Sequence, residues 1–579
     1  MKYVATFDSH SIYEEDIENS GGVVTHTPSV VYCKEEDEVH YNLERIDSIL
    51  IYVGDLSGNT NESIKIYYNN NSTYDEIPIA EGDKWYSYVM AEGKDFYGIN
   101  GSKAIEEVQI KAVFSKRVTK WEERLVPTTV KKTVFEDCIS DKVTTIYCFF
   151  TNCSNMTSLD ISGFKTDNVT EMGYVFYGCS KLEALDIAHW KTDNVKSMNS
   201  MFYNCQALKT LDLGNFNTRL VTNMDKMFWN CSGLTYLNVG SFDTTNVNSM
   251  MEIFRNCISL ETINVENWNV GKITNMIRMF HNCQNLKSID LSKWNTSSAT
   301  NINSMFLWCK NITELDIGNW NTTNVTDMGH LFGYCSNLLS LNLNSWNTSK
   351  VNNMSFTFYS NEKITSIRIE DWDTSNVATF SCMFYNCNSL LSIDVSRWNV
   401  GKVTDMSQMF KQCRSLNNID LSKWNTISLT NIYEMFRDCN GINEIDLNDW
   451  NTSNITNMNS TFLNCKNLAI INIDNWDTSK VTNMNALFMN CYNIKSLDLS
   501  KWNVGNVTVM TEMFKYCTSL ETLDISNWNL SVLTNTNNMF SNCNKLKTIY
   551  MRNCSQDLII KFKAQLINDK ISDNVIIIN

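Results

Sequence analysis

VKSMNSMFYNCQALKTLDLGNFNT, residues 195–218, is one unit of a pattern that decides the fold. The pattern returns every 26 residues, without insertion, from about residue 143 to residue 553. A fixed period of roughly 20–50 residues indicates a solenoid, because one repeat cannot bury its apolar face alone and must stack on its neighbours. The sequence therefore predicts an array of about sixteen coils of 26 residues.

Each unit contains two local patterns. The apolar residues of Met198–Cys205 fall at positions i, i+3, i+4 and i+7, which is one face of a short helix. Thr222, followed three residues later by Asp225, is typical of the N-cap of the equivalent helix in the next coil. The alternation in Leu211–Leu213 predicts a short strand with Asp212 facing away from the core. We therefore expect an α/β solenoid with one helix and one strand in each coil.

The cysteines follow the repeat. Their constant place predicts small, buried, apolar side chains. Neither a CxxC pair nor a histidine pattern supports metal ligands or nucleophiles. Free thiols also suit folding in a reducing cytoplasm. The register skips at Asn361, and fifteen of the twenty cysteines hold the position: Cys153, Cys179, Cys205, Cys231, Cys257, Cys283, Cys309, Cys335, Cys387, Cys413, Cys439, Cys465, Cys491, Cys517 and Cys543.

An aromatic residue follows each predicted strand, as Trp294 and Trp346 do. A row of tryptophans could bind carbohydrate, but a constant position beside a strand favours packing in the core. The next residue is usually Asn or Asp, as at Asn295 and Asn347. We expect these side chains to hydrogen-bond backbone groups between adjacent coils.

The run LSKWNTS at Leu291–Ser297, followed by Met305-Phe306 and Cys309, resembles the BspA-like leucine-rich-repeat surface proteins. That family contains the mycoplasma-type lipoprotein repeat, and the match covers roughly residues 140–555. The resemblance implies a leucine-rich-repeat-like solenoid and an adhesin that binds macromolecules of a host or a neighbouring cell. Asp8 interrupts the N-terminus before an apolar segment forms, so we expect no signal peptide, unlike the bacterial members.

The two ends do not repeat. We expect a small all-β attachment domain over residues 1–130, the solenoid over residues 131–553 and a C-terminal cap over residues 554–579. Thr27–Cys33 and Val39–Asn42 are similar to N-terminal stretches in proteins of gut Bacteroidales and their phages, which implies docking to a larger particle. The runs that predict strands in the first domain are Ser29–Cys33, Ser48–Val53, Ile64–Tyr68, Trp85–Val89 and Val108–Phe114.

Composition and motifs exclude several classes of function. The net charge of -15 would repel a phosphate backbone, so nucleic-acid binding is not expected. No apolar run reaches the roughly eighteen residues of a membrane span. The chain has no HExxH motif, nucleophile elbow or glycine-rich phosphate loop, and its six histidines are scattered. We therefore expect neither an enzyme nor a cofactor.

The outward strand position is the first candidate binding surface. It is mostly Asp or Asn, and stacked carboxylates repel one another unless something relieves them. Hydrogen bonds to neighbouring Ser or Thr, hydration, calcium or a basic ligand would all do so. Calcium takes roughly six to eight oxygens, more than one column supplies. The binding candidates are Asp290, Asp316, Arg368, Asp394, Asp420 and Asp446.

The position after the constant Phe is the second candidate surface. It carries aromatic residues in many coils, and on the predicted helix they would be half exposed and able to pack against a partner protein. The candidates are Tyr177, Tyr203, Trp229, Tyr359 and Tyr385.

These features predict a non-catalytic adhesion or recognition protein. We expect a phage virion appendage, a fibre or decoration made in the host cytoplasm, whose solenoid binds a host-surface glycan or protein. Residues 1–130 would join it to a virion or surface anchoring protein. A purely structural virion component and an adhesin of a bacterial cell surface are the alternatives, and homo-oligomerisation is a further option.

Overall fold

The computed structural model divides into two compact units, Met1–Asn295 and Thr296–Asn579. The structure describes nine strands before residue 137, and then residues 145–578 except 163 and 531. The nine strands are β1 (Lys2–Asp8), β2 (Ile12–Ile17), β3 (Ile46–Val53), β4 (Glu62–Tyr68), β5 (Tyr74–Ile79), β6 (Lys84–Val89), β7 (Phe96–Gly101), β8 (Val108–Phe114) and β9 (Val130–Glu136).

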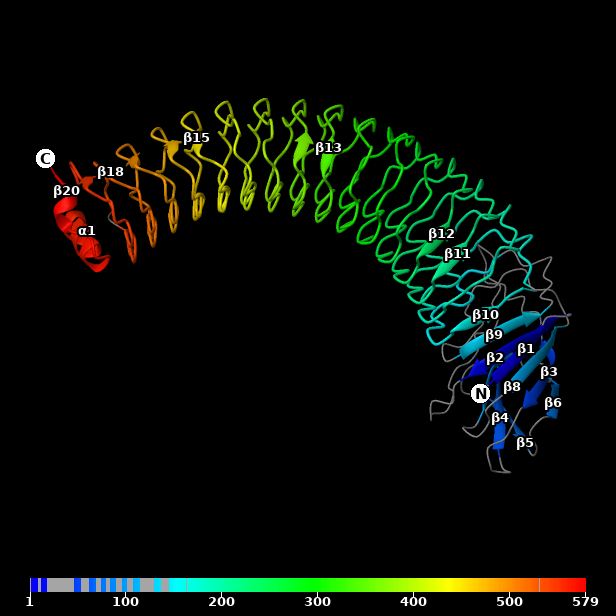
Figure 1. Cartoon of the computed structure of the whole chain (residues 1–579). Helices are drawn as coiled ribbons and strands as arrows, with labels where there is room; N and C mark the ends of the chain where they lie inside the picture. Colours follow the sequence, from blue (N-terminus) through cyan, green and yellow to red (C-terminus); the bar gives the residue numbers. More distant parts are fainter. Residues whose placement is uncertain are drawn as a thin grey trace. The chain divides into compact units, whose positions relative to one another are not determined.

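Two sheets contain these strands. One has the order β5-β4-β7, and the other has the order β10-β9-β2-β1-β8-β3-β6 (Figure 1). β9 pairs in parallel with β10 (Ser158–Asp160), with Lys132 opposite Ser158, which is the 26-residue step of the repeat. The strand column of the solenoid therefore starts in β9. Four of the expected runs lie in β3, β4, β6 and β8, whereas residues 27–42 lie outside the described residues. A separate all-β domain over residues 1–130 stays a prediction.

From residue 145 the chain forms a β-solenoid of about fourteen turns of roughly 26 residues, compared with the sixteen coils expected. Equivalent residues of successive coils pair in parallel, as Leu211 does with Leu237 in the first unit and Leu497 with Leu523 in the second. The remaining elements are β11 (Thr210–Asp212), β12 (Tyr236–Asn238), β13 (Ser340–Asn342), β14 (Ser366–Arg368), β15 (Glu444–Asp446), β16 (Ile470–Asn472), β17 (Ser496–Asp498), β18 (Thr522–Asp524), β19 (Thr548–Tyr550), α1 (Gln556–Asn568), the 3-10 helix η1 (Asp573–Val575) and β20 (Ile576–Ile577).

The predicted helix in each coil is wrong, because successive turns take its place. In Met198–Cys205, alternate N–H groups bond to the next coil, as Ser200 N does to the Asp225 carbonyl at 2.8 Å. The N–H groups between them bond to the carbonyl three residues earlier, as Tyr203 N does to Ser200, and close turns of four residues. Ser200 and Asn204 adopt φ of 54° and 65°, in the left-handed region. An α-helix would need every N–H for its own carbonyls, so the bonds between coils exclude it. The N-cap at Thr222 is wrong for the same reason, since Thr222 N bonds to the Lys196 carbonyl.

The tryptophan column lies in the core, as predicted. The Nε1 group of Trp294 donates to the Val265 carbonyl at 3.0 Å, and that of Trp346 donates to the Ile317 carbonyl at 2.9 Å. Both rings are buried. In the second unit Trp320 stacks on Trp346 with ring centroids 6.0 Å apart. These rings have no free face for a sugar, so the carbohydrate interpretation of this column is wrong.

At Asn347 the residue after the tryptophan does not make the expected side-chain bond to a backbone group of the adjacent coil. The Asn347 side chain instead accepts the N–H of Ser349, at 3.1 Å, which closes a local turn. Thr348 makes the contact between coils, because its Oγ1 donates to the Asp373 carbonyl at 2.9 Å. The Thr348 hydroxyl therefore joins adjacent coils at this corner.

The cysteine column is buried, and most of its thiols make the same contact. The Sγ atom of Cys231 donates to the Phe202 carbonyl at 3.0 Å, and that of Cys387 donates to the Phe358 carbonyl at 3.2 Å. The cysteines in the described part of the chain are free thiols. Burial raises the pKa of Cys231 to about 12. The prediction of buried cysteine side chains is therefore confirmed for this column.

Asn361 interrupts the cysteine column, and we expect Asn361→Cys to raise the free energy of unfolding by about 1–3 kcal/mol. The Asn361 side chain is fully buried, and within the described residues neither its Nδ2 nor its Oδ1 has a hydrogen-bond partner. A cysteine would remove this penalty, and its thiol would lie near the Phe332 carbonyl, by analogy with Cys387. Urea unfolding of the full chain measures the change. The exposed control Asn417→Cys should shift stability by less than about 0.5 kcal/mol, and an equal shift in both variants would contradict the explanation.

The helix α1 closes the end of the second unit (Figure 1). Inside the solenoid, Phe514 N bonds to the Met539 carbonyl of the next coil. The equivalent Phe540 N has no coil beyond it and bonds instead to the Asp569 carboxylate at 2.9 Å. Phe562 of α1 packs edge-on against Phe540, with centroids 5.9 Å apart. The cap therefore supplies the acceptor and the ring that a further coil would provide.

Within the described residues, no helix has the length and apolar character needed to span a membrane.

Candidate functional site

The outward strand residues point to solvent. Arg368 lies in β14 beside Asn342 of β13, and Asp446 lies in β15 beside Asn472 of β16. Asp290 belongs to the first unit and the other candidates belong to the second. The exposed candidates are Asp290, Asp316, Arg368, Asp394, Asp420 and Asp446.

Local hydrogen bonds occupy these carboxylates. Asp420 Oδ1 accepts the hydroxyl of Ser422 at 2.7 Å and its N–H at 3.0 Å. These bonds lower the pKa of Asp420 below its usual value. Asp446 accepts the N–H of Asn448 at 3.1 Å in the same way. The carboxylate therefore closes the turn after each strand, which relieves the repulsion along the column without a cation.

Nothing in the described residues forms a metal cage. No group of three or more His, Cys, Asp or Glu side chains there is placed to hold a metal ion. Calcium binding by the Asp column, one of the alternatives that the sequence offers, stays an untested prediction.

Arg368 is the one cation among the six strand candidates. Its Nη2 lies 2.9 Å from Glu370 Oε1. Partial burial raises the pKa of Glu370, but hydrogen bonds from its own N–H and from Arg368 outweigh it, and the pKa is lowered. Because Arg368 replaces the usual acid, the column changes sign between Asn342 and Asp394. A partner that contacts this stretch therefore meets a cation flanked by neutral and acidic groups.

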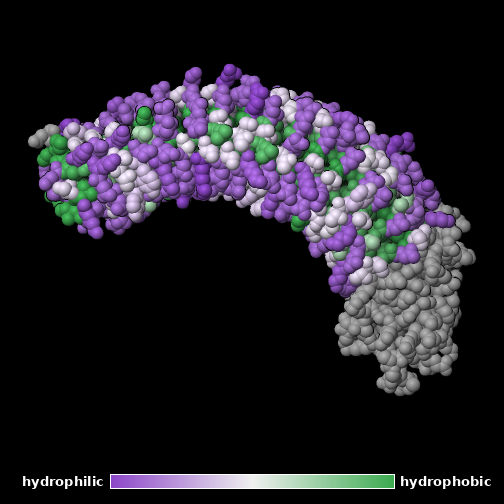
Figure 2. All heavy atoms as spheres, in the orientation of Figure 1, coloured by the Kyte–Doolittle hydropathy of each residue, from purple (hydrophilic) through white to green (hydrophobic). Residues whose placement is uncertain are grey.

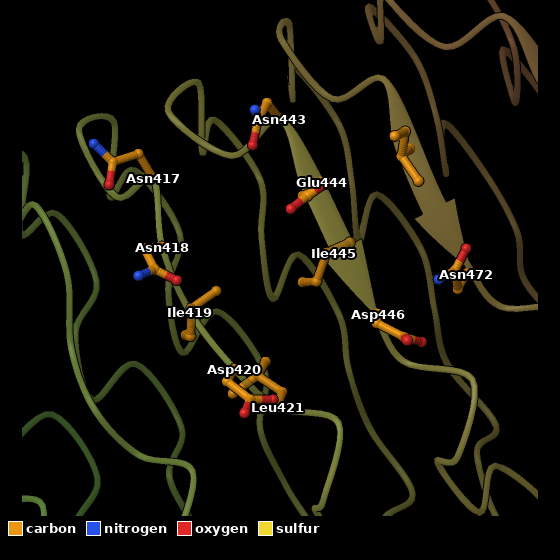
Figure 3. Close-up of a pocket in the computed structure, with 11 residues that line it drawn as sticks. Asn417, Asn418, Ile419, Asp420, Leu421, Asn443, Glu444, Ile445, Asp446 and Asn472 are labelled. Carbon is orange, nitrogen blue, oxygen red and sulfur yellow. The ribbon is translucent and has the colours of Figure 1, made fainter.

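A groove of about 450 Å³ lies on the strand side of the second unit, across three successive coils (Figure 3). It brings together two of the predicted residues, Asp420 and Asp446. The first coil contributes residues 417–421, the second contributes Asn443 and β15, and the third contributes residues of β16. Its lining consists of Asn417, Asn418, Ile419, Asp420, Leu421, Asn443, Glu444, Ile445, Asp446, Ile470 and Asn472.

Sequence reasoning missed the apolar part of this surface. Ile470 is 54% exposed and occupies a strand position that is Ser in β13, β14 and β17. Leu339 and Leu391, which precede the strand position in their coils, are also exposed. The signal was present in the sequence as aliphatic residues at a place where most coils have a polar residue. These side chains offer contacts that the acidic column alone does not.

The aromatic candidates lie on the segment of turns, not on the strands. Tyr177 stacks on Tyr203 with centroids 4.4 Å apart, and the Trp229 ring meets Tyr203 edge-on at 4.6 Å. In the second unit Tyr359 stacks on Tyr385 at 4.7 Å. All five are half-buried. Since neighbouring rings already cover much of the stacked faces, mainly ring edges and hydroxyl groups remain for a ligand.

A cation ends each aromatic stack. The Arg255 guanidinium lies 4.7 Å from the centre of Trp229, and Lys411 Nζ lies 5.1 Å from the centre of Tyr385. Cations over aromatic faces contribute roughly 0.5–1 kcal/mol at exposed sites. The stacks therefore stabilise the contact between coils. The structure does not bring the aromatic candidates together with the strand candidates.

The repeat matches one protein family. A model described as "Mycoplasma protein of unknown function, DUF285" matches residues 124–236, 232–315, 308–393, 389–470 and 460–558. The chain belongs to this family. The DUF285 matches span the whole solenoid and agree with the mycoplasma-type repeat identified in the sequence. The family description assigns no activity, and the BspA-like relationship and the likeness to Bacteroidales proteins stay predictions.

Solved structures with a similar fold share little sequence with this DUF285 chain. A Toll chain in the Toll–Spatzle complex of Drosophila has 15% identity and a TM-score of 0.24, over 70% of this chain and 48% of that one. This protein thus matches about half the length of that Toll chain. The functional domain of InlJ from Listeria monocytogenes, which includes a cysteine ladder, has 13% identity and a TM-score of 0.18, over 80% and 71% of the two chains. The APL1 leucine-rich repeat domain has 14% identity and a TM-score of 0.19, over 69% and 82%. No curated protein matches the chain.

Proposed function

We propose that this DUF285 protein is a non-catalytic recognition protein that binds another protein through the strand side of its second unit. The observation that carries the proposal is the groove lined by β15 and β16, with Ile470 exposed at its wall. Protein interfaces place a few apolar anchors in such hollows and surround them with polar groups. The strand side has both, because exposed aliphatic residues lie among Asn and Asp side chains.

The chemistry of the groove indicates the kind of partner. Asp420, Glu444 and Asp446 make its lining acidic, and no basic residue lines it. A protein segment that presents an apolar side chain next to Lys or Arg would therefore match both the hollow and its charge. Display on a virion or a cell surface, and glycan as the ligand, remain predictions from the sequence.

A random peptide library displayed on phage, panned against the full chain, tests this function while the partner is still unidentified. We expect enriched peptides that combine apolar and basic residues. Ile470→Asp should weaken their binding by about tenfold or more, which corresponds to about 1.4 kcal/mol.

Ile427→Asp is the matched control. Ile427 is 51% exposed, nearly the same fraction as Ile470, but it does not line the groove. Its replacement should therefore leave peptide binding unchanged. Peptides that bind both variants equally well, or no enrichment over an unrelated protein, would overturn the assignment of recognition to this surface.

A further inference from the structure

Three exposed aliphatic side chains share the strand side of the second unit with the groove. Leu339 and Leu391 are each 52% exposed, and Ile470 is 54% exposed. Leu391 adjoins the groove, because its carbonyl accepts the N–H of Asn417, a lining residue, at 3.1 Å. Figure 2 shows hydrophobic residues spaced among hydrophilic ones along the second unit. Apolar anchors within polar surroundings are typical of a recognition surface.

A column of polar side chains runs parallel to these anchors. The anchors lie at the start of the strand position in their coils. The column lies at its end, where Figure 3 shows Asp420 and Asp446. Its exposed members in the coils from Leu339 to Ile470 are Asn342, Arg368, Asp394, Asp420, Asp446 and Asn472. Along the coils the column is therefore neutral, then basic, then acidic in three coils, and neutral again.

The charged groups of this column are accessible to a partner. The Arg368 guanidinium contacts Glu370 through Nε and Nη2, yet the Arg368 side chain remains 61% exposed. Asp394 and Asp446 accept the N–H groups of their turns through Oδ1, so Oδ2 can accept a further hydrogen bond. A partner with basic groups against the acids and an acidic group against Arg368 complements the column.

This surface is long and narrow. Each strand from β13 to β16 is three residues long, so the leucines and the column lie roughly 10 Å apart. Five steps of 26 residues lead from the coil of Leu339 to that of Ile470, which is roughly 24 Å at about 4.8 Å a step. An α-helix is about 10–12 Å across, and about sixteen of its residues span that length. One helix laid along the coils would therefore contact both the anchors and the column.

The spacing of the coils favours a helix over an extended segment. A helix presents the same face once a turn, about every 5.4 Å, so against steps of about 4.8 Å it drifts by roughly 3 Å over five coils. Side chains can absorb that drift. An extended strand presents the same face at every second residue, about every 6.7 Å, and drifts by roughly 9–10 Å, about two whole coils. Of the two, the helix keeps one contact for each coil.

We propose that the partner's contact element is an amphipathic α-helix that lies along the coils of the second unit, with its apolar stripe on Leu339, Leu391 and Ile470. This inference rests on the proposed function, and it names the element that the strand side recognises. Basic side chains on one flank of the helix face the three Asp residues of the column, and an acidic side chain faces Arg368. Because Arg368 lies at one end of the charged stretch, these charges fix the direction of the helix.

A synthetic peptide of about twenty residues, titrated into the full chain, tests the helical occupant. As a helix it spans roughly 30 Å. Leucines form one stripe, lysines form the neighbouring flank, and a glutamate replaces the lysine at one end. The control peptide has the same composition with leucine and lysine in alternation, which favours an extended form. We expect fluorescence anisotropy to show about tenfold tighter binding of the helical peptide.

Variants of the chain test the anchors and the direction. Leu391→Asp should weaken binding of the helical peptide by about tenfold. Ile427→Asp, at a side chain that is 51% exposed but lies outside the strand position, should leave binding unchanged. Arg368→Glu should weaken binding several-fold, and a peptide with lysine in place of its glutamate should recover affinity for this variant. Far-UV circular dichroism checks that each variant keeps the fold, since all three side chains are exposed.

Equal binding of the two peptides, or no binding of the helical one, overturns the helical occupant. Binding that Leu391→Asp leaves unchanged overturns it as well. Failure of the lysine peptide to recover affinity for Arg368→Glu overturns the direction. The proposed function is decided separately, by the response of the library peptides to Ile470→Asp.

Discussion

Above pH 9 the solenoid is expected to unfold over a narrow range of pH. Burial raises the pKa of the cysteine column, to about 12 for Cys231, Cys283, Cys335 and Cys387, from an ordinary value of 9.0. The folded chain therefore retains protons that the unfolded chain releases. The contribution of the protonated thiols to the free energy of unfolding is complete below pH 9 and is lost as the pH rises from 9 towards 12.

The number of thiols makes this effect large. Each one lowers the free energy of unfolding by about 1.4 kcal/mol per pH unit within that window. These four thiols would together remove roughly 6 kcal/mol per pH unit, which is comparable to the whole stability of a typical domain, about 5–15 kcal/mol. We expect the midpoint between about pH 9 and 11. Tryptophan fluorescence and far-UV circular dichroism, recorded with reductant from pH 7 to 11.5, follow the loss of the buried tryptophan and strand columns.

Cys335→Ala separates ionisation from packing. At pH 7 this variant should be about 1–2 kcal/mol less stable, because it loses the 3.2 Å bond from Cys335 Sγ to the Phe306 carbonyl and some packing. Above pH 9 its stability should fall less steeply, by about 1.4 kcal/mol per unit. A solenoid that keeps its fluorescence and dichroism up to pH 11.5 would show that the thiols do not govern alkaline stability.

Periodicity predicted the parts of the fold that repeat most strictly. Leu211 and Asp212 lie in β11 as expected, with Asp212 in solvent, and Leu213 follows directly after this strand. The columns of Trp and Cys are buried as expected. These predictions succeeded because a constant side chain at a constant spacing reflects a constant environment in a stacked array.

The helix prediction failed because two structures share one spacing. Successive turns bury the apolar residues of Met198–Cys205 just as a helical face would, so the side-chain pattern alone does not separate them. Backbone preference offered a better signal. Asn204, Asn230 and Asn256 precede the cysteine and adopt positive φ, and Asn enters the left-handed region more readily than most residues.

The candidate surface was harder to predict, because it depends on departures from the repeat. The repeat identifies a column of Asp residues, but hydrogen bonds such as Asp420 to Ser422 show that the column closes turns. Recognition would instead rely on single coils that differ, such as those with Ile470 and Arg368. One sequence shows these as exceptions, and only the stacking of three coils shows that Asp420, Asp446 and Ile470 meet at one groove.

Glu434→Gln is expected to lower the free energy of unfolding by about 3 kcal/mol at neutral pH. The side chain of Glu434 is 4% exposed, and Lys411 Nζ lies 2.5 Å from its carboxylate. Gln408 Nε2 donates to it at 2.7 Å, and Arg437 also binds it. Burial raises the pKa of Glu434, but the hydrogen bonds from Lys411, Gln408 and Arg437 outweigh burial and lower the pKa to about 2.

The pH dependence of this variant identifies the cause. A lowered pKa contributes stability above the unfolded value of 4.5, and that contribution is lost as the pH falls towards 2. The gap between wild type and Glu434→Gln should therefore shrink by about 3 kcal/mol between pH 6 and pH 2 in urea unfolding. Glu444→Gln makes the same change at an exposed strand position ten residues later and should produce no such gap. A Glu434→Gln deficit that persists at pH 2 would mean that Glu434 stabilises the coil by packing and not by its charge.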